Sequence, residues 1–254
     1  PSTSSAASDV YKRQSAGFAI LMSDRLALEV GANIRGCFLN VNINADGNKK
    51  SISGPGAGNY FSVGKTFKDI ETVFGSKTLQ EKSCFLAHGT GTPLNRITES
   101  HIVSTFAKEF GIENLPVTSV KSKLGHTMGT AGMDQIWCGL GALESQKLTG
   151  ICTIPKLADD VFKDNLDFFL DNKEFGSQKD IAFLNSKGFG GNNATSALIS
   201  SSLTEELLQR RFTEKELKAW KKKREATLKL REKNFELAVN LSLIHISEPT
   251  RLEP

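Results

Sequence analysis

The sequence predicts an α/β protein whose central sheet is covered by helices. Short apolar runs of strand length alternate along the chain with longer segments of helical spacing, which is the pattern of an α/β core. Of the 254 residues, 39% are hydrophobic and 24% are charged, the balance of a globular protein with a packed core. No apolar run reaches the roughly 18 residues of a membrane-spanning helix, and the first residues lack the apolar segment of a secretory signal.

Strands are expected in seven short runs that are rich in apolar and β-branched residues. The alternation is imperfect in the second run, where Phe38, Val41 and Ile43 carry the pattern. In chain order the runs are GFAILMSD (17–24), RGCFLNVNINADG (35–47), CFLA (84–87), LPVTSV (115–120), ICTIP (151–155), IAFLNS (181–186) and TSALIS (195–200).

Helical spacing of apolar residues marks three segments between these strands. Residues 60–74 and 98–110 show the one-sided apolar pattern of a helix that covers a core, and Gly111 ends the second of them. Residues 130–143 are almost all small or apolar, so we expect a buried helix there. The turn-rich stretch 46–58 is expected to be a loop.

The strand CFLA ends in an unusual way. It is followed by His88 and then by Gly-Thr-Gly-Thr, residues 89–92. A histidine at the carboxyl end of a strand, beside flexible backbone and small hydroxyl groups, can face a ligand. A lone histidine at this place is also compatible with a side chain that is simply hydrogen-bonded at the end of a strand.

Two further motifs stand at comparable places. In KSKLGH, Lys121 and His126 lie in a loop between a strand and the buried helix. His126 precedes that helix by about one turn, where the positive end of the helix dipole disfavours the imidazolium and leaves a neutral hydrogen-bond donor. GFGG, residues 188–191, is either a tight turn or a place where backbone N–H groups meet an oxyanion.

The four cysteines show neither a CxxC motif nor a paired spacing. We expect buried thiols in a reducing compartment, either the cytoplasm or the matrix of an organelle. Together with the histidines they do not give the ligand spacing of a zinc site, so no metal is expected. The cysteines are Cys37, Cys84, Cys138 and Cys152.

The net charge of +4 lies near the end of the chain. Residues 203–240 are typical of one long charged helix or a helix pair, and they hold eleven basic and seven acidic residues, so the remainder is neutral overall. No aromatic residues are interleaved with the basic ones as in a nucleic-acid groove, so no nucleic-acid partner is expected. The run KKKR, 221–224, could steer an acidic carrier protein, although such helices are usually solvated faces with i,i+4 ion pairs.

Taken together, HGTGT, KSxxGH and GFGGxN resemble the C-terminal half of the β-ketoacyl synthases, the condensing enzymes of fatty-acid and polyketide synthesis. The order and separation of the three motifs carry the resemblance, which runs from about Gly17 to Ile199. It implies the thiolase-like fold with layers in the order α/β/α/β/α, of which this chain would hold mainly the C-terminal half. It also implies a homodimer, an acyl carrier protein as partner, and no cofactor beyond the phosphopantetheine that carries the substrate.

The resemblance assigns a catalytic role to three residues. In the family, a cysteine accepts an acyl chain, a malonyl group is decarboxylated, and the resulting carbanion attacks the thioester. His88 and His126 match the histidines that hydrogen-bond the malonyl group and the developing enolate, and Lys121 matches the lysine that organises the site.

The same resemblance points to a set of substrate-binding residues. Thr90 and Thr92 match the threonines beside the pantetheine arm. Phe189 matches the phenylalanine that gates the acyl pocket. The glycine motif that follows it adds Gly190, Gly191 and Asn193.

The sequence departs from the family pattern at several positions. None of the four cysteines fits the strand-to-helix turn that carries the nucleophile, so we expect a fragment that does not condense acyl chains by itself. Asn95-Arg96 replaces Gly-Asp, Gln135 replaces a glutamate, and Lys187 replaces a phenylalanine. Because an unpaired buried charge is costly, the added cations are expected to reach solvent or to pair, with Glu99 and Asp134 as candidate partners.

These observations divide the chain into five parts. The two ends, 1–14 and 241–254, contain SSAASDVYKRQ and LSLIHISEPTR, which resemble peptides translated from sequencing-adaptor read-through. Residues 15–53 are expected to end the N-terminal half of a ketosynthase, 54–202 to form its C-terminal half, and 203–240 to be a basic helical extension.

Other functions would share this fold. A non-catalytic partner subunit, like a chain-length factor, or a malonyl decarboxylase would have the fold without the cysteine. A non-decarboxylating thiolase is disfavoured by the pair of HGTGT and KSxxGH motifs.

Overall fold

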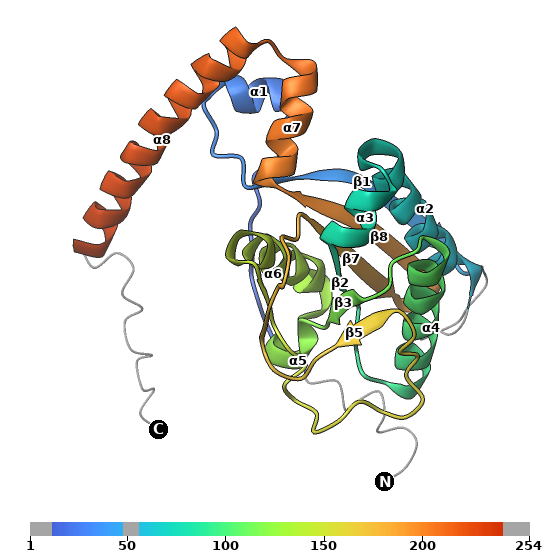
Figure 1. Cartoon of the computed structure of the whole chain (residues 1–254). Coiled ribbons are helices and arrows are strands. Elements are labelled where there is room, and N and C mark those ends of the chain that lie inside the picture. Colours follow the sequence, from blue (N-terminus) through green and yellow to red (C-terminus); the bar gives the residue numbers. More distant parts are fainter. Residues whose placement is uncertain (1–11, 48–55, 241–254) are drawn as a thin grey trace, which may run out of the picture. The chain divides into compact units, whose positions relative to one another are not determined.

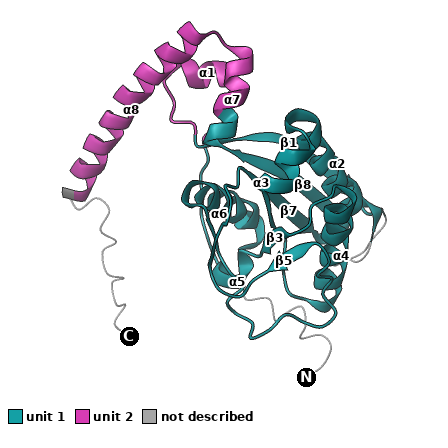
Figure 2. Ribbon diagram, in the orientation of Figure 1, with its two compact units in different colours: residues 1–19, 35–204 teal, residues 20–34, 205–254 magenta. Residues whose placement is uncertain are grey.

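A six-stranded mixed sheet organises most of the chain. The computed structural model describes residues 12–47 and 56–240, which form two compact units (Figure 1; Figure 2). The first unit holds residues 12–19 and 35–204, and the second holds residues 20–34 and 205–240.

The sheet of the first unit has the strand order β1-β8-β7-β2-β3-β5. Strands β7, β2, β3 and β5 are parallel to their neighbours in this series, whereas β8 is antiparallel to both β7 and β1. The two-residue strands β4 and β6 form a separate antiparallel pair. The bounds are β1 Gly36–Ala45, β2 Ser83–Leu86, β3 Leu115–Thr118, β4 Lys147–Leu148, β5 Leu166–Phe168, β6 Lys173–Glu174, β7 Ile181–Gly188 and β8 Asn192–Ser200.

Helices cover both faces of this sheet (Figure 1). On one face α2 (Ala57–Phe74) packs on β1 and β8 and beside α4 (Pro93–Glu109). On the other face α6 (Ala131–Ser145) packs on β7 and β8. The shorter helices are α3 (Ser76–Lys82) and α5 (Lys121–Leu124). The described residues of the first unit thus form an α/β/α arrangement of layers.

The two faces of the sheet build separate cores, because alternate residues of a strand point to opposite faces. Phe85 and Phe183 pack with Phe67 of α2, and the rings of Phe67 and Phe183 are stacked with their centroids 4.2 Å apart. On the opposite face Leu86 packs with Leu143 of α6. Since β2 and β7 bury both of their faces, their sequences are continuous apolar runs rather than alternating ones.

The prediction of an α/β fold is confirmed, together with most of its elements. The ends of the confirmed elements differ from the predicted ones by a few residues. Helix α4 begins earlier than expected, because Thr92 is its N-cap and Pro93 occupies its first position, where a missing N–H costs nothing. The confirmed strands are those at 35–47, 84–87, 115–120, 181–186 and 195–200, and the confirmed helices are those at 60–74, 98–110 and 130–143.

Two predicted strands are wrong. Residues 17–22 have no regular structure, and their side chains Phe18 and Leu21 are 87% and 75% exposed; the segment then enters helix α1 (Asp24–Glu29). Residues 151–155 form turns, with one hydrogen bond at 2.9 Å from the Ile151 N–H to the Phe169 carbonyl. Apolar composition favours a strand only where a neighbouring strand supplies a ladder of hydrogen bonds, and neither segment has one.

Two expectations of burial also need correction. Helix α6 is not buried on every side, because Trp137 is 43% exposed. Of the cysteines, Cys84 is buried and Cys37 and Cys138 are half-buried, but Cys152 is exposed in a turn rather than at the start of a strand. None of the four cysteines forms a disulfide bond.

Some predicted segments fall outside the described residues. These are 1–11 and 241–254 in the adaptor-like ends, and 48–55 within the predicted loop at 46–58. In the part of the chain that the structure describes, no helix is both long enough and apolar enough to cross a membrane.

The second unit is a cluster of helices around Trp220. Helix α1, the end of α7 (Ser201–Arg211) and α8 (Glu214–Asn240) contribute Leu28, Leu208 and Trp220 to a small apolar core. The indole N–H of Trp220 donates to the Ala32 carbonyl at 3.0 Å. The prediction of a charged helix pair is thus confirmed by α7 and α8.

The basic run KKKR is used within this unit. Lys221 and Arg224 form ion pairs with Glu205 at 3.2 and 2.9 Å, and Lys223 donates to the Glu29 carbonyl at 2.8 Å. The guanidinium of Arg224 also lies over the Trp220 ring, 4.7 Å from its centroid. These contacts favour the structural interpretation of the run over a docking surface.

Candidate active site

The first site histidine follows the buried strand β2. His88 is only 7% exposed, and its backbone N–H donates to Glu99 Oε1 at 2.7 Å. Its ring Nδ1 accepts the backbone N–H of Lys187 at 3.2 Å. A neutral imidazole carries one proton, so a ring that accepts at Nδ1 has its proton on Nε2.

The second histidine adopts the same tautomer. His126 is partly buried, and its Nδ1 accepts the backbone N–H of Met128 at 3.1 Å. Its proton therefore also lies on Nε2. The Arg13 N–H donates to the His126 carbonyl at 3.1 Å, so part of the segment that the sequence predicts as adaptor-like lies beside the site.

Both rings line one cavity of about 330 Å³. They stand edge to face with their centroids 5.7 Å apart. The rest of the lining comes from Ile43 of β1, from the turn before α6 and its first residues, and from the facing ends of β7 and β8. We name this space the histidine cavity. In the sequence these segments are linked only by the resemblance to the family. In the structure they line the same cavity.

Burial and nearby positive charge keep both rings of the histidine cavity neutral. Burial and the positive charge of Lys121 lower the pKa of His88 to about 3. Burial and the same charge lower the pKa of His126. Burial also lowers the pKa of Lys121, against the opposing effect of Glu99 and Asp134. At neutral pH the cavity is thus lined by two neutral N–H donors with a lysine close by.

Glu99 fixes the backbone that carries His88. Its buried carboxylate accepts four hydrogen bonds, from the N–H groups of His88 and Gly89 and from the amides of Asn95 and Asn185, at 2.6–3.1 Å. Burial alone would raise the pKa of Glu99, but the charge of Lys187 and these donors lower it. A carboxylate with four donors is an anion that the fold stabilises.

Gly89 is required at the next position. It has a φ of 53°, and a Cβ added there would lie 2.2 Å from the Ser119 hydroxyl oxygen. Ser119 instead donates to the Gly89 carbonyl at 2.8 Å. Glycine therefore lets the chain turn away from the strand immediately after His88.

Gln135 explains one of the departures from the family pattern. Its Nε2 donates to the carbonyls of Leu86, Ala87 and Asn185 at 3.2, 3.0 and 3.0 Å, and its Oε1 accepts from Ser186 at 2.9 Å. An ionised glutamate could donate to none of these carbonyls, whereas an amide has two N–H bonds, one of which is shared between two of the three carbonyls. Gln135 therefore ties the end of β2, next to His88, to β7.

The two cations that replace residues of the family pattern, Arg96 and Lys187, lie in different surroundings. Arg96 makes a bidentate ion pair with Asp160, with both N–O distances 2.8 Å, so the expected partners Glu99 and Asp134 are wrong for this residue. Lys187 is buried rather than solvated, and its charge acts on Glu99; the pairing of the two stays a prediction. The sequence offered no signal for Asp160, which lies 64 residues away from Arg96.

The hydroxyls of HGTGT lie outside the wall of the histidine cavity, and so do Phe189, Gly190 and Gly191 of the glycine motif, whereas Gly188, Asn192 and Asn193 line it. Thr90 and Thr92 share a hydrogen bond with their Oγ1 atoms 3.2 Å apart. Phe189 is 69% exposed at the start of a 3-10 turn, whose residues Gly190 and Gly191 have φ values of 80° and 82°. Of the two predictions for GFGG, the tight turn is confirmed.

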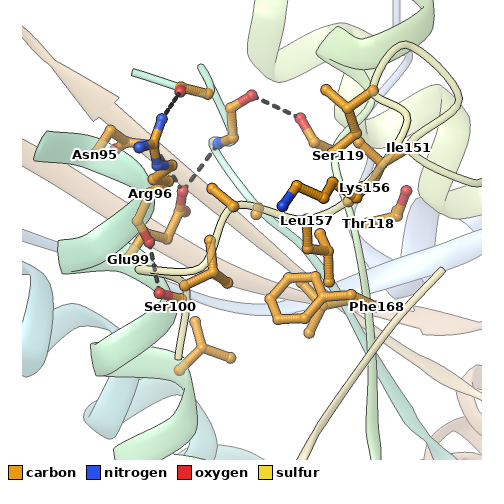
Figure 3. Close-up of a pocket in the computed structure, with 18 residues that line it drawn as sticks. Asn95, Arg96, Glu99, Ser100, Thr118, Ser119, Ile151, Lys156, Leu157 and Phe168 are labelled. Carbon is orange, nitrogen blue, oxygen red and sulfur yellow. Dashed lines mark hydrogen bonds between the residues drawn. The ribbon is translucent and has the colours of Figure 1, made fainter. Parts of the chain in front are cut away.

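A second cavity borders the same loop. Ala87 and Gly89, on either side of His88, line an apolar space of about 200 Å³ instead of the histidine cavity (Figure 3). The remaining walls come from Gly91, from α4, from the end of β3, from residues 151–161 and from Phe168 of β5. We name it the apolar cavity.

No described residue that lines the histidine cavity is a cysteine. Cys84 lies inside β2, and burial raises the pKa of its thiol to about 12, so it is an inert core residue. The expectation that the nucleophile is missing from this chain stays a prediction.

Comparison with known proteins agrees with this geometry. The family described as "Beta-ketoacyl synthase, C-terminal domain" matches residues 37–154, the stretch that contains His88, Lys121 and His126. The chain carries a β-ketoacyl synthase C-terminal domain. The predicted family and the thiolase-like fold are thereby confirmed.

Individual relatives match a larger share of the chain than the family does. The chain is 43% identical over 216 residues to the beta-ketoacyl-(acyl-carrier-protein) synthase FabY of Pseudomonas aeruginosa, covering 84% of this chain and 34% of that protein. The crystal structure of the noncanonical ketosynthase FabY from P. aeruginosa superposes with a TM-score of 0.77 over 80% of this chain and 32% of that one, at 43% identity.

A more distant relative belongs to a larger protein. The highly reducing polyketide synthase calA of Penicillium decumbens is 32% identical over 194 residues, which is 71% of this chain and 7% of that protein. The chain thus spans about a third, or much less, of the length of these relatives.

Proposed function

We propose that this chain forms the hydrogen-bond-donating half of a β-ketoacyl synthase site, which acts in the decarboxylative Claisen condensation of malonyl units with acyl chains. The observation that carries the proposal is the pair of neutral imidazoles in the histidine cavity, both with the proton on Nε2. Two such donors at one cavity match the need of a reaction that develops negative charge on one oxygen.

The chemistry follows from these donors. In the malonyl thioester the bond to the carboxylate breaks, carbon dioxide leaves, and the electron pair becomes an enolate. The Nε2–H groups of His88 and His126 stabilise the enolate oxygen, each by about 3 kcal/mol if placed as in other oxyanion sites. The enolate carbon then attacks an acyl thioester, and the thiolate leaves. The cysteine that would carry that acyl group is not among the residues lining the histidine cavity.

Neutral rings suit this reaction better than charged ones. An imidazolium is acidic enough to give its proton to the carbanion, which would end the reaction without a new carbon–carbon bond. A neutral imidazole donates a hydrogen bond and keeps its proton. Lys121 has the positioning role here, because its charge helps to keep both rings neutral.

Substrate binding is assigned on the same basis. Thr90 and Thr92 would hydrogen-bond the amides of the phosphopantetheine arm of an acyl carrier protein. Phe189, exposed at a turn with two positive-φ glycines, would move to admit the acyl chain, with Gly190 and Gly191 as its hinge, and Asn193 would contact the substrate from the wall of the histidine cavity. The proposal includes a homodimer, a reducing compartment in which the four thiols stay free, and no metal or further cofactor.

The direct test is ligand binding at the two rings. The full chain, labelled with ¹⁵N in its histidines, is titrated with a malonyl-pantetheine analogue in which an amide replaces the thioester. The Nε2–H signals of His88 and His126 are expected to shift together and saturably. His101, which bonds to Tyr60 at 2.7 Å and does not line the cavity, is the control inside the same spectrum.

The outcome separates the proposal from its rival. No shift at His88 and His126, or an equal shift at His101, contradicts the proposal. A folded chain that binds no malonyl analogue would favour a non-catalytic partner subunit of the chain-length-factor kind, the interpretation supported by the lack of a cysteine at the cavity.

A second assay tests the missing nucleophile. The chain alone is expected to form no β-ketoacyl product from acyl- and malonyl-carrier proteins. Product formation by the purified chain would show that a nucleophile is present after all.

A further inference from the structure

The turn between His126 and helix α6 has an unusual backbone. Met128 has a φ of 59°, in the left-handed region that only a few per cent of residues other than glycine adopt. In this conformation its backbone N–H donates to His126 Nδ1 at 3.1 Å. Because a left-handed methionine costs free energy, other contacts must hold the turn in this form.

Thr127 is the residue through which the turn is held. It is 7% exposed, and its Oγ1 donates to Asp134 Oδ2 at 2.5 Å. Its carbonyl accepts the Thr130 hydroxyl at 3.1 Å. The side chain and the backbone of Thr127 are thus both tied to the start of α6 (Ala131–Ser145).

Asp134 is the fixed end of this contact. It lies in the first turn of α6, where the positive end of the helix dipole stabilises a carboxylate. Its other oxygen, Oδ1, lies 2.9 Å from the Ser15 hydroxyl, which is also 2.8 Å from Thr130 Oγ1. Both carboxylate oxygens thus face hydroxyl groups, which keep the side chain in one orientation.

Asp134 does not face the substrate. Neither Asp134 nor Thr127 is among the described residues that line the histidine cavity, whereas His126 and Met128 are. Any effect of Asp134 on the site therefore passes through the residues of the turn.

We propose that Asp134 is a positioning residue for His126. By accepting the Thr127 hydroxyl, it holds the turn in the form in which the Met128 N–H occupies His126 Nδ1, and so keeps the proton of the ring on Nε2. Without this hold the ring could carry its proton on either nitrogen. The inference deepens the proposed function and rests on it only for the use of that proton, since the contacts belong to the chain without substrate.

The test reads the tautomer of His126 directly. Nitrogen-15 spectra of the histidines in the full chain distinguish a proton on Nδ1 from one on Nε2, and at pH 8 both cavity rings are neutral because their pKa values are lowered from 6.5. Asp134→Ala is expected to shift the ratio of the two His126 tautomers about fivefold toward Nδ1–H, which is the effect of losing one hydrogen bond. His88, whose Nδ1 accepts the Lys187 N–H, is expected to stay unchanged and is the control within the same spectrum.

A conservative variant separates the hydrogen bond from the charge. In Asp134→Asn the amide oxygen still accepts the Thr127 hydroxyl and the amide N–H₂ donates to Ser15, whereas the charge that also acts on Lys121 is lost. This variant is expected to keep the tautomer of the unaltered chain. Glu144→Ala, which removes a carboxylate from the last turn of the same helix, is the matched control and is expected to have no effect.

A second pair of variants tests the contact from its other side. Thr127→Val removes the hydroxyl and leaves Asp134 in place, so it is expected to shift the His126 tautomers as Asp134→Ala does. Thr127→Ser keeps the hydroxyl and is expected to leave them unchanged. This pair decides the matter even if Asp134→Ala does not fold.

Three results would overturn the proposal. One is an unchanged ratio of His126 tautomers in folded Asp134→Ala or Thr127→Val. Another is an equal shift at His88, which would mean a general loosening of the chain. The third is an Asp134→Asn chain that behaves like Asp134→Ala, which would assign the effect to the charge. None of these spectra needs a malonyl analogue, so a failure of this inference is distinguished from a failure of the proposed function.

Discussion

The histidine cavity and the apolar cavity lie against one short loop, yet they offer opposite environments. His88 lines the first, while its neighbours Ala87 and Gly89 line the second. The first has two neutral imidazoles beside lysines, and the second has mostly apolar walls. Alternation along a few residues after β2 is enough to separate the two, because neighbouring side chains of an extended segment point to opposite faces.

Glu99 belongs to both environments. Its carboxylate holds the backbone of His88 and Gly89, and the same side chain lines the apolar cavity. Changes at Glu99 should therefore damage both cavities, whereas changes in either lining should damage only one.

The largest effect is expected for Glu99→Ala. It leaves four donors without an acceptor, so the free energy of unfolding should fall by about 3–5 kcal/mol. Urea denaturation of the full chain measures this. Glu109→Ala, an exposed position of the same helix α4, is the matched control and should change stability by less than about 0.5 kcal/mol. Equal effects of the two exchanges would mean that Glu99 does not organise the loop.

The next largest loss of stability is expected for Gln135→Glu, and this loss should depend on pH. An ionised carboxylate would face the carbonyls of Leu86, Ala87 and Asn185, so the folded chain would raise the pKa of the new glutamate. Stability is then retained below the unfolded pKa of about 4.3 and lost as pH rises, by about 3 kcal/mol at pH 8.

Unfolding at pH 5 and pH 8 checks the effect of Gln135→Glu. Gln209→Glu, on the exposed face of α7, supplies the same charge change without the carbonyls and should show little pH dependence. A Gln135→Glu chain as stable at pH 8 as the unaltered chain would contradict the hydrogen bonds assigned to Gln135.

The lowered pKa of His88 predicts that the stability of the chain depends on pH with the opposite sign. Its pKa is lowered to about 3 in the folded chain, so the unfolded chain binds more protons as pH falls. The contribution is fully present above about pH 6.5 and is lost as pH falls toward 3, by about 2 kcal/mol at pH 5.

The variant His88→Gln isolates this contribution. The loss of stability between pH 7 and pH 5 should be smaller in the variant by about that amount, whereas the two chains should respond alike between pH 7 and pH 8. Parallel curves throughout would mean that His88 titrates normally in the folded chain.

The smallest effect is expected at the edge of the apolar cavity. Arg96 and Asp160 are partly exposed, with 31% and 39% of their side chains accessible, and such ion pairs contribute little to stability. Arg96→Ala should instead speed hydrogen exchange of the amides in residues 157–162, which the pair holds beside α4. Exchange that speeds equally in β8 would indicate a global loss of stability.

The sequence predicted the fold well where composition and pairing agree. The apolar runs at CFLA and IAFLNS are strands because β2 and β7 lie side by side and bury both faces. The runs at 17–24 and 151–155 have similar composition but no neighbouring strand, and composition cannot reveal that. The sequence did not show which segments pair as neighbouring strands when they lie far apart in the chain.

The site shows the same limit. The motifs predicted that His88 follows a strand and that His126 precedes a helix, and the structure has both residues there. The tautomers depend on the backbone N–H groups of Lys187 and Met128, and the first of these lies 99 residues from His88.

The most direct test of the central claim is the protonation of the two rings. Nitrogen-15 spectra of the histidines in the full chain at pH 7 report the charge and tautomer of each ring. The account predicts neutral Nε2–H rings for both His88 and His126. A protonated ring, or a proton on Nδ1 in either residue, would contradict the claim that the fold presents two neutral donors to one cavity.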